Sequence, residues 1–387
     1  MVLTVAIFSC INLYNYAYPE LNKDAVQFFF NNKKNITEEN NSLYARVGFG
    51  APSEVDDIYE YGQNLINKSL GETYVQNNKH YLLESVFNKF ENELIFHGDS
   101  EKLLCWLEED KYISDVVKEA CYTSNELVNV INDNTILLKR HEQLKNYTQY
   151  DDKLLFGAYG SLLINAHRLF LSDIRLQLES NNEEAIKKLI DDLNYFRGIM
   201  RQPANMVTKA IHMVLYGLSL NQLGLIVKKY PHLTIKHKED IINVLNDISD
   251  EEFNLDDLIR QEFKAVNYIF CIDENLEIKT NYLCQPNTVI DEKIAYFIIN
   301  DFYDFYLNFK YIFSLESDEM KKECQRYAYD SKPEDIYRLI LLLPFFKMHQ
   351  TYILLMDGII KGCEIMVNHK SYSSRHDEIK SYLESYQ

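Results

Sequence analysis

Residues 153–200, KLLFGAYGSLLINAHRLFLSDIRLQLESNNEEAIKKLIDDLNYFRGIM, contain the pattern that decides the fold. Apolar side chains in the first half recur three and four residues apart, at Leu155, Tyr159, Leu162, Leu163, Ala166, Leu169 and Phe170. Side chains at this spacing lie on one face of an α-helix. The polar segment ESNN interrupts the pattern, which resumes at Ile186, Leu189, Ile190, Leu193 and Phe196. Because two long helices joined by a short polar break must lie antiparallel, we predict an αα-hairpin.

The helical pattern continues beyond this hairpin. A second polar break, QPAN, places Pro203 near the first turn of a third apolar helix that extends towards residue 230. Residues 153–230 therefore look like tetratricopeptide hairpins in architecture, although they lack the signature residues of that repeat. Most of the remaining chain is also typical of helices, and only residues 265–290 have the β-branched and aromatic mixture of a small β-hairpin. We predict a mainly α fold of antiparallel helical hairpins, either tetratricopeptide-like or an irregular α-α bundle.

The composition supports a folded helical protein with an acidic surface. Gly and Pro number only 12 and 7 among 387 residues, which is few for the many turns of an all-β or α/β fold. Apolar residues make up 47% of the chain and charged residues 25%, as in globular proteins. The formal net charge is −18, whereas phosphate backbones are bound through Lys and Arg. Nucleic acid is therefore not expected as a partner, and broad adhesion to anionic lipid is disfavoured too.

No sequence motif points to metal binding or catalysis. The seven cysteines include no CxxC or other close pair, so neither a zinc site nor an iron–sulfur cluster is expected. Unpaired core thiols are the favoured interpretation, and Cys271 and Cys284 are close enough in sequence to pair in an oxidising compartment. The ten histidines are scattered, and the chain has no P-loop, zinc-helix or nucleophile-elbow motif. We predict no metal and no cofactor, and we favour binding over catalysis.

The opening segment, residues 1–19, is uncharged and rich in apolar side chains. As a helix it would extend roughly 28 Å, close to the hydrocarbon thickness of a bilayer. No Lys or Arg precedes the apolar run, although a signal peptide or signal anchor normally has a basic flank there. A membrane anchor or signal is the favoured interpretation, and a buried core helix is the main alternative. A lipoprotein signal ending at Cys10 fits poorly, because the bulky Phe8 stands where a small residue is expected.

Composition divides the chain into five parts. Residues 1–19 form the anchor or signal-like segment, residues 20–40 a polar linker and residues 41–150 an N-terminal helical region. Residues 151–250 form the helical-hairpin region, and residues 251–387 a C-terminal helical region. Charged residues interrupt the apolar stretches of that last region, so no second membrane span is expected.

Polar residues interrupt apolar helical faces at Asn165, His167 and Arg168 in the middle of the first hairpin helix and at Lys209 in the third helix. Asn165, Arg168 and Lys209 form the candidate ligand-binding site. A buried charge is unfavourable unless it is paired, so we expect Lys209 to meet a carboxylate on a neighbouring helix. The carboxylates available are Asp173, Asp191 and Asp192. A salt bridge that fixes helix packing is the plainer interpretation, and a polar pocket that binds a ligand or does acid–base chemistry is the alternative.

The segment NSLYARVGFGAPSEVDDIYEYG, residues 41–62, contains two glycines in a chain that has few. Gly48 and Gly50 mark a place where the backbone bends or is approached closely. Together with the hairpin region, this segment resembles a group of uncharacterised proteobacterial membrane-anchored envelope proteins. The matching residues are Asn41, Tyr44, Ala45, Gly48, Phe49, Ala51 and Pro52. The resemblance implies an anchored, periplasm-facing helical protein; it carries no known activity, so it transfers no catalytic residue.

These observations predict a membrane-tethered helical protein of the bacterial cell envelope that acts by binding a protein partner. The runner-up is an α-helical hydrolase or small-ligand-binding protein with its site at Asn165, Arg168 and Lys209, and the third hypothesis is a secreted bacterial effector. We expect the anchor in the bacterial inner membrane and the body in the periplasm, as the resemblance implies. The basic residues that follow the anchor would instead keep the body in the cytoplasm by the positive-inside rule, so that alternative stays open.

Overall fold

The computed structural model describes part of the chain in detail. The described residues are 21–30, 40–75, 94–103, 121–150, 160–204, 206–246, 255–270, 300, 303–304, 306–308, 310–315, 317–330 and 371–386. They are mainly helical, and they contain no strand; one isolated bridge joins Asn41 to Gln149. The predicted mainly α fold is therefore confirmed. Where a small β-hairpin was predicted near 265–290, residues 265–270 are helical, and residues 271–290 lie outside the described part, as does the opening segment 1–19.

The chain forms two compact units, each described by itself. The first unit comprises Met1–Asn35, Asn77–His80 and Leu255–Val367, and the second comprises Ile36–Gln76, Tyr81–Asn254 and Asn368–Gln387. The five-part division made from the sequence stays a prediction.

Aromatic rings hold the described part of the first unit together. Helix α2 (Lys23–Phe30) packs on α15 (Leu255–Phe270), where the rings of Phe29 and Phe263 stack at 4.0 Å between centroids. Phe28 stacks on Tyr306 at 4.1 Å, and the Arg260 guanidinium lies 4.4 Å from the Phe28 ring centroid. The same unit contains α17 (Ser317–Asp330).

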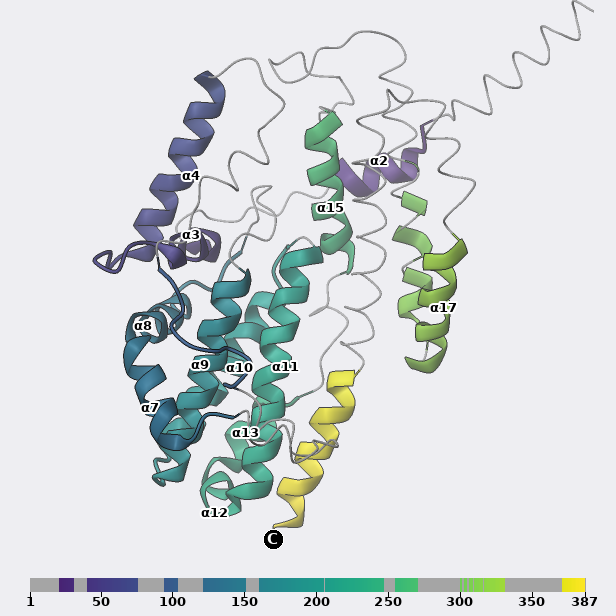
Figure 1. Cartoon of the computed structure of the whole chain (residues 1–387). Helices are drawn as coiled ribbons and strands as arrows, with labels where there is room; N and C mark the ends of the chain where they lie inside the picture. The colour runs from purple at the N-terminus through teal and green to yellow at the C-terminus, as the bar shows by residue number, and fades with distance from the viewer. Residues whose placement is uncertain are drawn as a thin grey trace, which may run out of the picture. The chain divides into compact units, whose positions relative to one another are not determined.

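A helical bundle forms the body of the second unit (Figure 1). Its helices, in chain order, are α7 (Ser124–Asp133), α8 (Thr135–Leu144), α9 (Gly160–Glu179), α10 (Glu184–Met200) and α11 (Met206–Lys229). Three short elements follow: α12 (Pro231–Thr234), η4 (Ile235–His237) and α13 (Lys238–Val244). The turn between α9 and α10 places Asn181 at a φ of 59°, and the two helices pack against each other. The αα-hairpin predicted from residues 153–200 is present.

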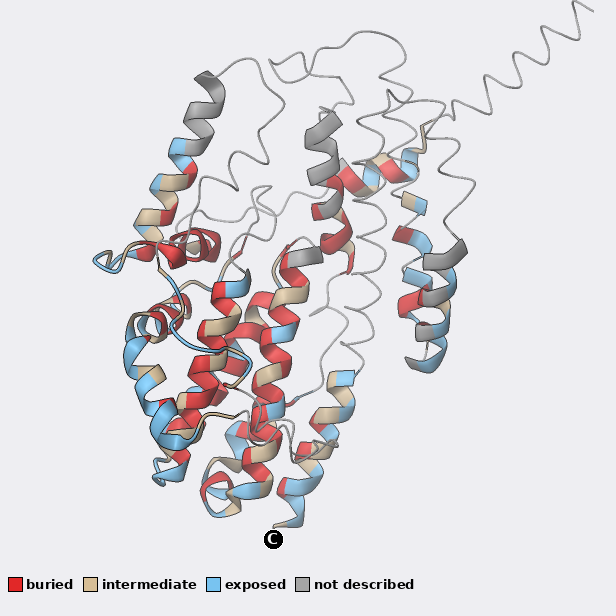
Figure 2. Cartoon of the chain, in the orientation of Figure 1, coloured by how far each residue is buried: buried red, intermediate tan, exposed pale blue. Residues whose placement is uncertain are grey.

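The core lies along α9, α10 and α11, where Figure 2 shows the buried residues concentrated. Leu169, Leu193 and Leu215, one from each of these helices, are fully buried. Within α11, residues Thr208–Lys229 are long and apolar enough to cross a membrane, with a mean hydropathy of 1.5. About two thirds of that window (67%) is buried inside the protein, which is how a core helix behaves.

The C-terminal helix, residues 371–385, covers one face of α11. The Tyr372 hydroxyl donates to the Met213 carbonyl at 2.7 Å, and Tyr216 and His376 share a buried hydrogen bond of the same length. A Cβ atom at Gly217 would lie 2.7 Å from the Tyr372 hydroxyl, so this glycine lets the two helices approach closely.

Helices α3 (Ser42–Val47) and α4 (Ile58–Val75) touch through their backbones. A Cβ atom at Gly48 would lie 1.8 Å from the Ile58 carbonyl oxygen, and one at Gly62 would lie 1.9 Å from the Tyr44 carbonyl oxygen. Neither site has room for a side chain. Gly48 also begins η2 (Gly48–Gly50), where the chain turns away from α3, so the predicted bend and close approach are both confirmed.

One buried arginine holds the irregular segment between α3 and α4. The Arg140 guanidinium donates to the carbonyl oxygens of Phe49 and Ala51 at 2.8 and 2.6 Å, and to those of Pro52 and Val55 at 2.6 and 3.1 Å. Arg140 is 2% exposed, and burial lowers the pKa of its guanidinium. Its four hydrogen bonds satisfy carbonyl groups that no helix or strand pairs.

Two cysteines depart from the expectation of unpaired thiols. Cys121 and Cys324 are each disulfide-bonded. The pair proposed from the sequence, Cys271 and Cys284, lies outside the described residues. The spacing of the cysteines in the sequence could not predict that Cys121 and Cys324 are disulfide-bonded, because a disulfide depends on how the fold places its cysteines.

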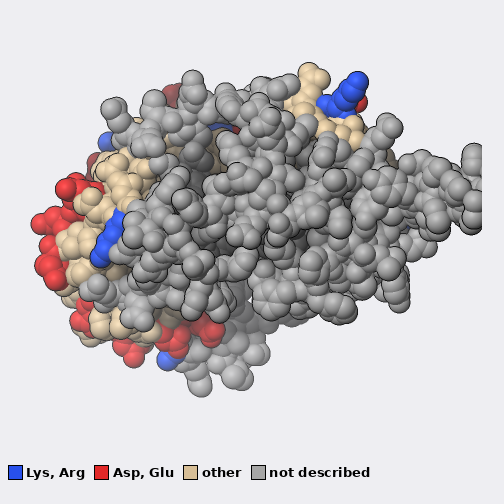
Figure 3. All heavy atoms as spheres, turned by 90° about the horizontal axis from the view of Figure 1, so that it is seen from above, with Lys and Arg blue, Asp and Glu red and all other residues tan. Residues whose placement is uncertain are grey.

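The described surface is rich in acidic groups. Seen from above in Figure 3, Asp and Glu side chains gather along one edge, with fewer Lys and Arg among them. A folded chain with a net charge of −18 is expected to present such a surface.

Candidate metal centre

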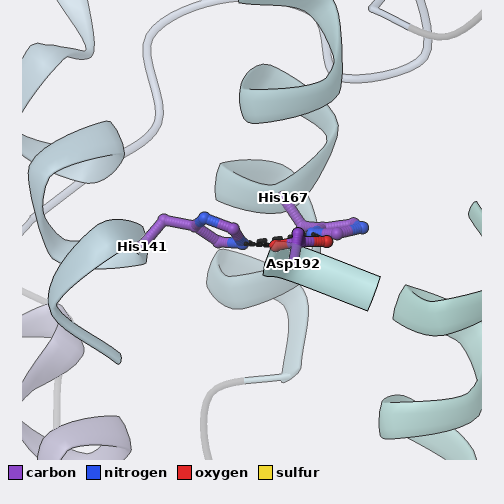
Figure 4. A group of neighbouring side chains, drawn as sticks. All are labelled: His141, His167 and Asp192. Atoms are coloured by element: carbon purple, nitrogen blue, oxygen red, sulfur yellow. Dashed lines mark hydrogen bonds and ion pairs between the residues drawn. The ribbon is translucent and has the colours of Figure 1, made fainter. Parts of the chain in front are cut away.

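Three polar side chains meet in the core of the second unit (Figure 4). His141 comes from α8, His167 from α9 and Asp192 from α10, and no side chain of the three is more than 1% exposed. A fourth, Ser219, comes from α11 and is also fully buried. Four helices thus each contribute one buried polar group to this region.

The nitrogen and oxygen atoms of the three residues are close together. His141 Nε2 lies 3.1 Å from His167 Nδ1 and 3.6 Å from Asp192 Oδ1. His167 Nδ1 lies 3.8 Å from Asp192 Oδ2. We refer to His141, His167 and Asp192 as the His–His–Asp group.

Outer contacts fix the orientation of His167 and Asp192. His167 Nε2 lies 3.0 Å from the Leu215 carbonyl oxygen, and a carbonyl only accepts, so Nε2 carries the proton and Nδ1 presents its lone pair. The Ser219 hydroxyl donates to Asp192 Oδ2 at 2.7 Å. Metal-binding histidines and carboxylates are typically oriented by such partners on the side away from the ion.

The group is incompletely satisfied. Asp192 Oδ1 and His141 Nδ1 make no hydrogen bond. The nearest charge to Oδ1 is the Lys145 ammonium, 3.7 Å away, which also lies 3.3 Å from Glu142 and 4.4 Å from the Phe170 ring centroid. Lys145 is 15% exposed, so its ammonium extends from the protein surface towards the buried carboxylate. A buried carboxylate oxygen that has one long ion pair and no hydrogen bond is energetically unfavourable.

Burial keeps both imidazoles neutral. Desolvation lowers the pKa of His167 to about 3, with the Lys145 charge acting in the same direction. Desolvation, His167 and Lys145 lower the pKa of His141 well below its ordinary value. Desolvation raises the pKa of Asp192 to about 6, while Lys145 and the Ser219 hydroxyl oppose that rise. At neutral pH the group therefore consists of two neutral imidazoles and a carboxylate, the protonation states that a metal ion requires of its ligands.

The spacing of the donor atoms fits a transition-metal ion. Zn²⁺ binds imidazole nitrogen and carboxylate oxygen at about 2.0–2.2 Å, so two ligand atoms on a tetrahedral ion are about 3.4 Å apart. The three separations found here, 3.1, 3.6 and 3.8 Å, lie around that value. Two imidazoles and one carboxylate form a ligand set typical of Zn²⁺ or Fe²⁺. Before His141 could bind an ion, its proton would have to move from Nε2 to Nδ1, which is free of other hydrogen bonds.

The candidate residues from the sequence lie elsewhere on the same helices. Asn165 and Arg168 are half-buried on α9, next to His167, and Arg168 Nε makes no hydrogen bond. Lys209 is buried on α11, as expected for a residue inside an apolar helix, and donates to the Met200 carbonyl.

The carboxylates proposed as partners of Lys209 have other roles. Asp173 accepts from Gln177 at 2.6 Å, and Asp191 is exposed. Asp192 belongs to the His–His–Asp group.

Sequence reasoning missed the group because its members come from three helices. A search for close pairs of ligands leads to the prediction of no metal, and the structure instead brings together residues 26 positions apart, His141 and His167. Asp192 and Ser219 are 27 positions apart. Polar residues on the apolar faces of consecutive helices, at nearly equal spacing, are the signal that would have revealed the site.

Comparisons with known proteins do not extend this description: no family model, no curated protein and no solved structure matches the chain. The resemblance to envelope proteins therefore stays a prediction.

Proposed function

We propose that this protein binds one divalent transition-metal ion, of which Zn²⁺ is the best fit, through His141, His167 and Asp192. The observation that carries the proposal is the convergence of three donor atoms from three helices, with separations of 3.1–3.8 Å. The second support is Asp192 Oδ1, a buried acceptor that makes no hydrogen bond and has only a long ion pair with Lys145, and that a metal ion would satisfy.

The ion would act on stability and shape rather than in turnover. All three ligands are at most 1% exposed, so an ion held between them would be buried rather than open to a substrate. An ion bound there joins α8, α9 and α10 at the centre of the bundle. Binding to the folded state alone stabilises it, by about 2.7 kcal/mol when the free ion is at 100 times its dissociation constant.

Lys145 is the residue that must respond when an ion binds. Its ammonium occupies the side of Asp192 that has no hydrogen bond, and two cations cannot both remain close to that oxygen. Glu142, half-exposed and already 3.3 Å from the ammonium, offers Lys145 a partner nearer the solvent. We expect Lys145 to move towards Glu142 when the ion enters.

The test is a zinc titration of the full chain after chelator treatment and dialysis. Calorimetry is expected to show one saturable site, and Co²⁺ in place of Zn²⁺ is expected to give the visible absorption of a tetrahedral nitrogen–oxygen site. Asp192→Asn keeps the shape of the side chain and removes its charge, and His167→Ala removes a ligand. His232→Ala is the matched control, because His232 is exposed on α12.

The proposal predicts that both ligand variants weaken zinc binding by at least about 100-fold and that the control does not. Circular dichroism of each variant shows whether it is folded. Wild-type protein that binds no zinc at micromolar concentration would overturn the proposal, and so would folded ligand variants that bind as tightly as the wild type.

We further propose that the metal-binding body belongs to the bacterial cell envelope, tethered through residues 1–19 and facing the periplasm, where it binds a protein partner. Disulfides persist in oxidising compartments, so the disulfide-bonded Cys121 and Cys324 support an address outside the cytoplasm. The helix Thr208–Lys229 is long and apolar enough to cross a membrane, but most of it is buried as a core helix, so the tether is proposed at residues 1–19 instead. The localisation is tested with a C-terminal tag in spheroplasts treated with protease. A periplasmic body predicts that the tag is digested, and protection of the tag would contradict it.

A further inference from the structure

A second buried polar group lies in the same unit, on α3, α10 and α11. Arg46 and Ser42 are one turn apart on α3, Tyr195 comes from α10 and His212 from α11. All four are buried: Arg46 is 7% exposed, Tyr195 8%, and Ser42 and His212 are fully buried. We call these four residues the Arg46 group.

The hydrogen bonds of Arg46 leave one edge of its guanidinium unused. Nη1 contacts His212 Nε2, and the guanidinium carbon lies 4.8 Å from the Tyr150 ring centroid. Nε and Nη2 make no hydrogen bond although both are buried. These two nitrogens form the side edge of the guanidinium, and their two parallel N–H groups match the two oxygens of a carboxylate or phosphate.

Two hydroxyl groups beside the guanidinium also lack a hydrogen bond of ordinary geometry. Ser42 Oγ and Tyr195 Oη are both buried without one. Arg46 and Ser42 nevertheless lie within hydrogen-bonding reach of the Tyr195 hydroxyl, and their interactions with it oppose the rise in its pKa that burial causes. The Arg46 guanidinium and the hydroxyls of Ser42 and Tyr195 therefore lie together, and the poor geometry of the contacts among them leaves their donors available to a ligand.

The electrostatic environment is positive. His212 receives the Arg46 Nη1–H on Nε2, so its proton is on Nδ1 and the ring is neutral. Burial, Arg46 and Lys209 together lower the pKa of His212 well below its ordinary value. Within the described residues, no carboxylate forms an ion pair with Arg46. A buried guanidinium without a counter-ion is strongly unfavourable, which favours an anion at this position.

We propose that the Arg46 group binds a small oxyanion, a carboxylate or a phosphate, held by Arg46 Nε and Nη2 and by the hydroxyls of Ser42 and Tyr195. His212 is a positioning residue, because it holds Nη1 and leaves the other edge of the guanidinium free. The proposal does not depend on the metal site, since the two groups share no residue. They are nevertheless close, because Asp192 and Tyr195 are one turn apart on α10 and the charge of Asp192 acts on the Tyr195 hydroxyl.

The test is a binding titration of the full chain with inorganic phosphate in one arm and acetate in the other. Chloride keeps the ionic strength constant, and EDTA removes metal, so that a failure of the metal proposal does not affect the result. Arg46→Lys retains the charge and loses the paired donors, and Tyr195→Phe removes one hydroxyl with little change in packing. Tyr382→Phe is the control, because Tyr382 is exposed on the C-terminal helix.

Saturable binding of either anion is expected, weakened about tenfold or more by Arg46→Lys and by a smaller factor by Tyr195→Phe, with no effect of the control. The arm that binds more tightly identifies the ligand as a phosphate or a carboxylate. The proposal is overturned if neither anion binds saturably to the wild type. It is also overturned if folded Arg46→Lys or Tyr195→Phe protein binds the preferred anion as tightly as the wild type.

Discussion

The His–His–Asp group and the Arg46 group are both buried polar groups of the second unit with a member on α10, and they differ in the kind of hydrogen bond that each leaves unmade. The His–His–Asp group has a carboxylate oxygen without a hydrogen bond, Asp192 Oδ1, and a lone pair on His167 Nδ1. The Arg46 group has unpaired donors on Arg46, Ser42 and Tyr195. A group with unused acceptors is suited to a cation, and a group with unused donors to an anion. The hydrogen bonds that are missing therefore indicate the class of ligand in each case.

The largest effect is expected from Gly62→Ala. This substitution should disturb the helix that carries part of the Arg46 group and leave the helices of the His–His–Asp group in place. Gly62 touches the backbone of α3, the helix that carries Arg46 and Ser42, and a methyl group there would lie 1.9 Å from the Tyr44 carbonyl oxygen. We expect a loss of about 3 kcal/mol in the free energy of unfolding, measured by urea denaturation, because backbone atoms on both sides must move. Anion binding should weaken, and zinc binding through α8, α9 and α10 should persist.

The matched control is Gly198→Ala on α10. A Cβ atom at Gly198 meets nothing within 4 Å, so alanine there should stabilise the helix by about 0.5–1 kcal/mol. Equal effects of the two substitutions would contradict the tight α3–α4 contact.

A second prediction concerns Arg140, which orders the segment that leads from α3 to α4. Arg140→Met keeps much of the apolar stem and removes four hydrogen bonds to carbonyl oxygens. We expect a loss of about 2–3 kcal/mol in the free energy of unfolding, because the buried carbonyl groups lose charged donors. Lys139→Met is the control, because Lys139 is the neighbouring residue and its side chain is exposed. It should change the free energy of unfolding by less than about 0.5 kcal/mol. A similar loss in both variants would show that Arg140 does not organise this segment.

A third prediction concerns Lys145, whose ammonium competes with a metal ion for Asp192. The substitution Lys145→Met removes the ammonium, which lies 3.7 Å from Asp192 and 4.4 Å from the Phe170 ring centroid, and keeps an unbranched apolar side chain. Zinc should bind about tenfold more tightly in a calorimetric titration, because no competing cation has to leave. Weaker zinc binding would show instead that Lys145 supports the site.

The smallest effect is expected from His212, through its contribution to the way the free energy of unfolding changes with pH. The groups that face it are Arg46 on α3, Lys209 one turn earlier on α11 and the Tyr150 ring, none of them acidic. Its folded-state pKa lies below the unfolded value, so the unfolded state binds the proton first as the pH falls. The stability that neutral His212 contributes is therefore complete above about pH 6.5 and is lost below it, by at most about 1.4 kcal/mol per pH unit.

His212→Gln should make the decline in unfolding free energy between pH 6.5 and 5 shallower than in the wild type. The two proteins are compared in EDTA, so that the buried histidines of the other group contribute equally to both slopes. Parallel slopes would contradict a neutral, buried His212.

The sequence could predict features that depend on local periodicity, but not those that depend on how helices pack against one another. The α9–α10 hairpin was predictable because Leu162, Leu169 and Leu193 repeat with the helical period, which is a local property of the chain. The close approach at Gly48 was also predictable, since glycine is rare here. Its partner Gly62 was not, because the contact depends on how two helices cross.

The candidate sites illustrate the same limit. Lys209 was expected to be buried, and it is, but its hydrogen bond goes to the Met200 carbonyl, which no side-chain pattern could reveal. The His–His–Asp group depends on the relative rotation of three helices about their axes, and the Arg46 group joins α3 to helices far away in sequence. Such arrangements follow from tertiary packing and leave no local motif.

The most direct test of the account is a crossed titration of Asp192→Asn and Arg46→Lys with zinc and with the oxyanion preferred by the wild type. The account predicts that Asp192→Asn loses zinc binding and keeps anion binding, and that Arg46→Lys loses anion binding and keeps zinc binding. Folded variants in which either substitution leaves both affinities unchanged would contradict the assignment of ligand class from unpaired buried atoms.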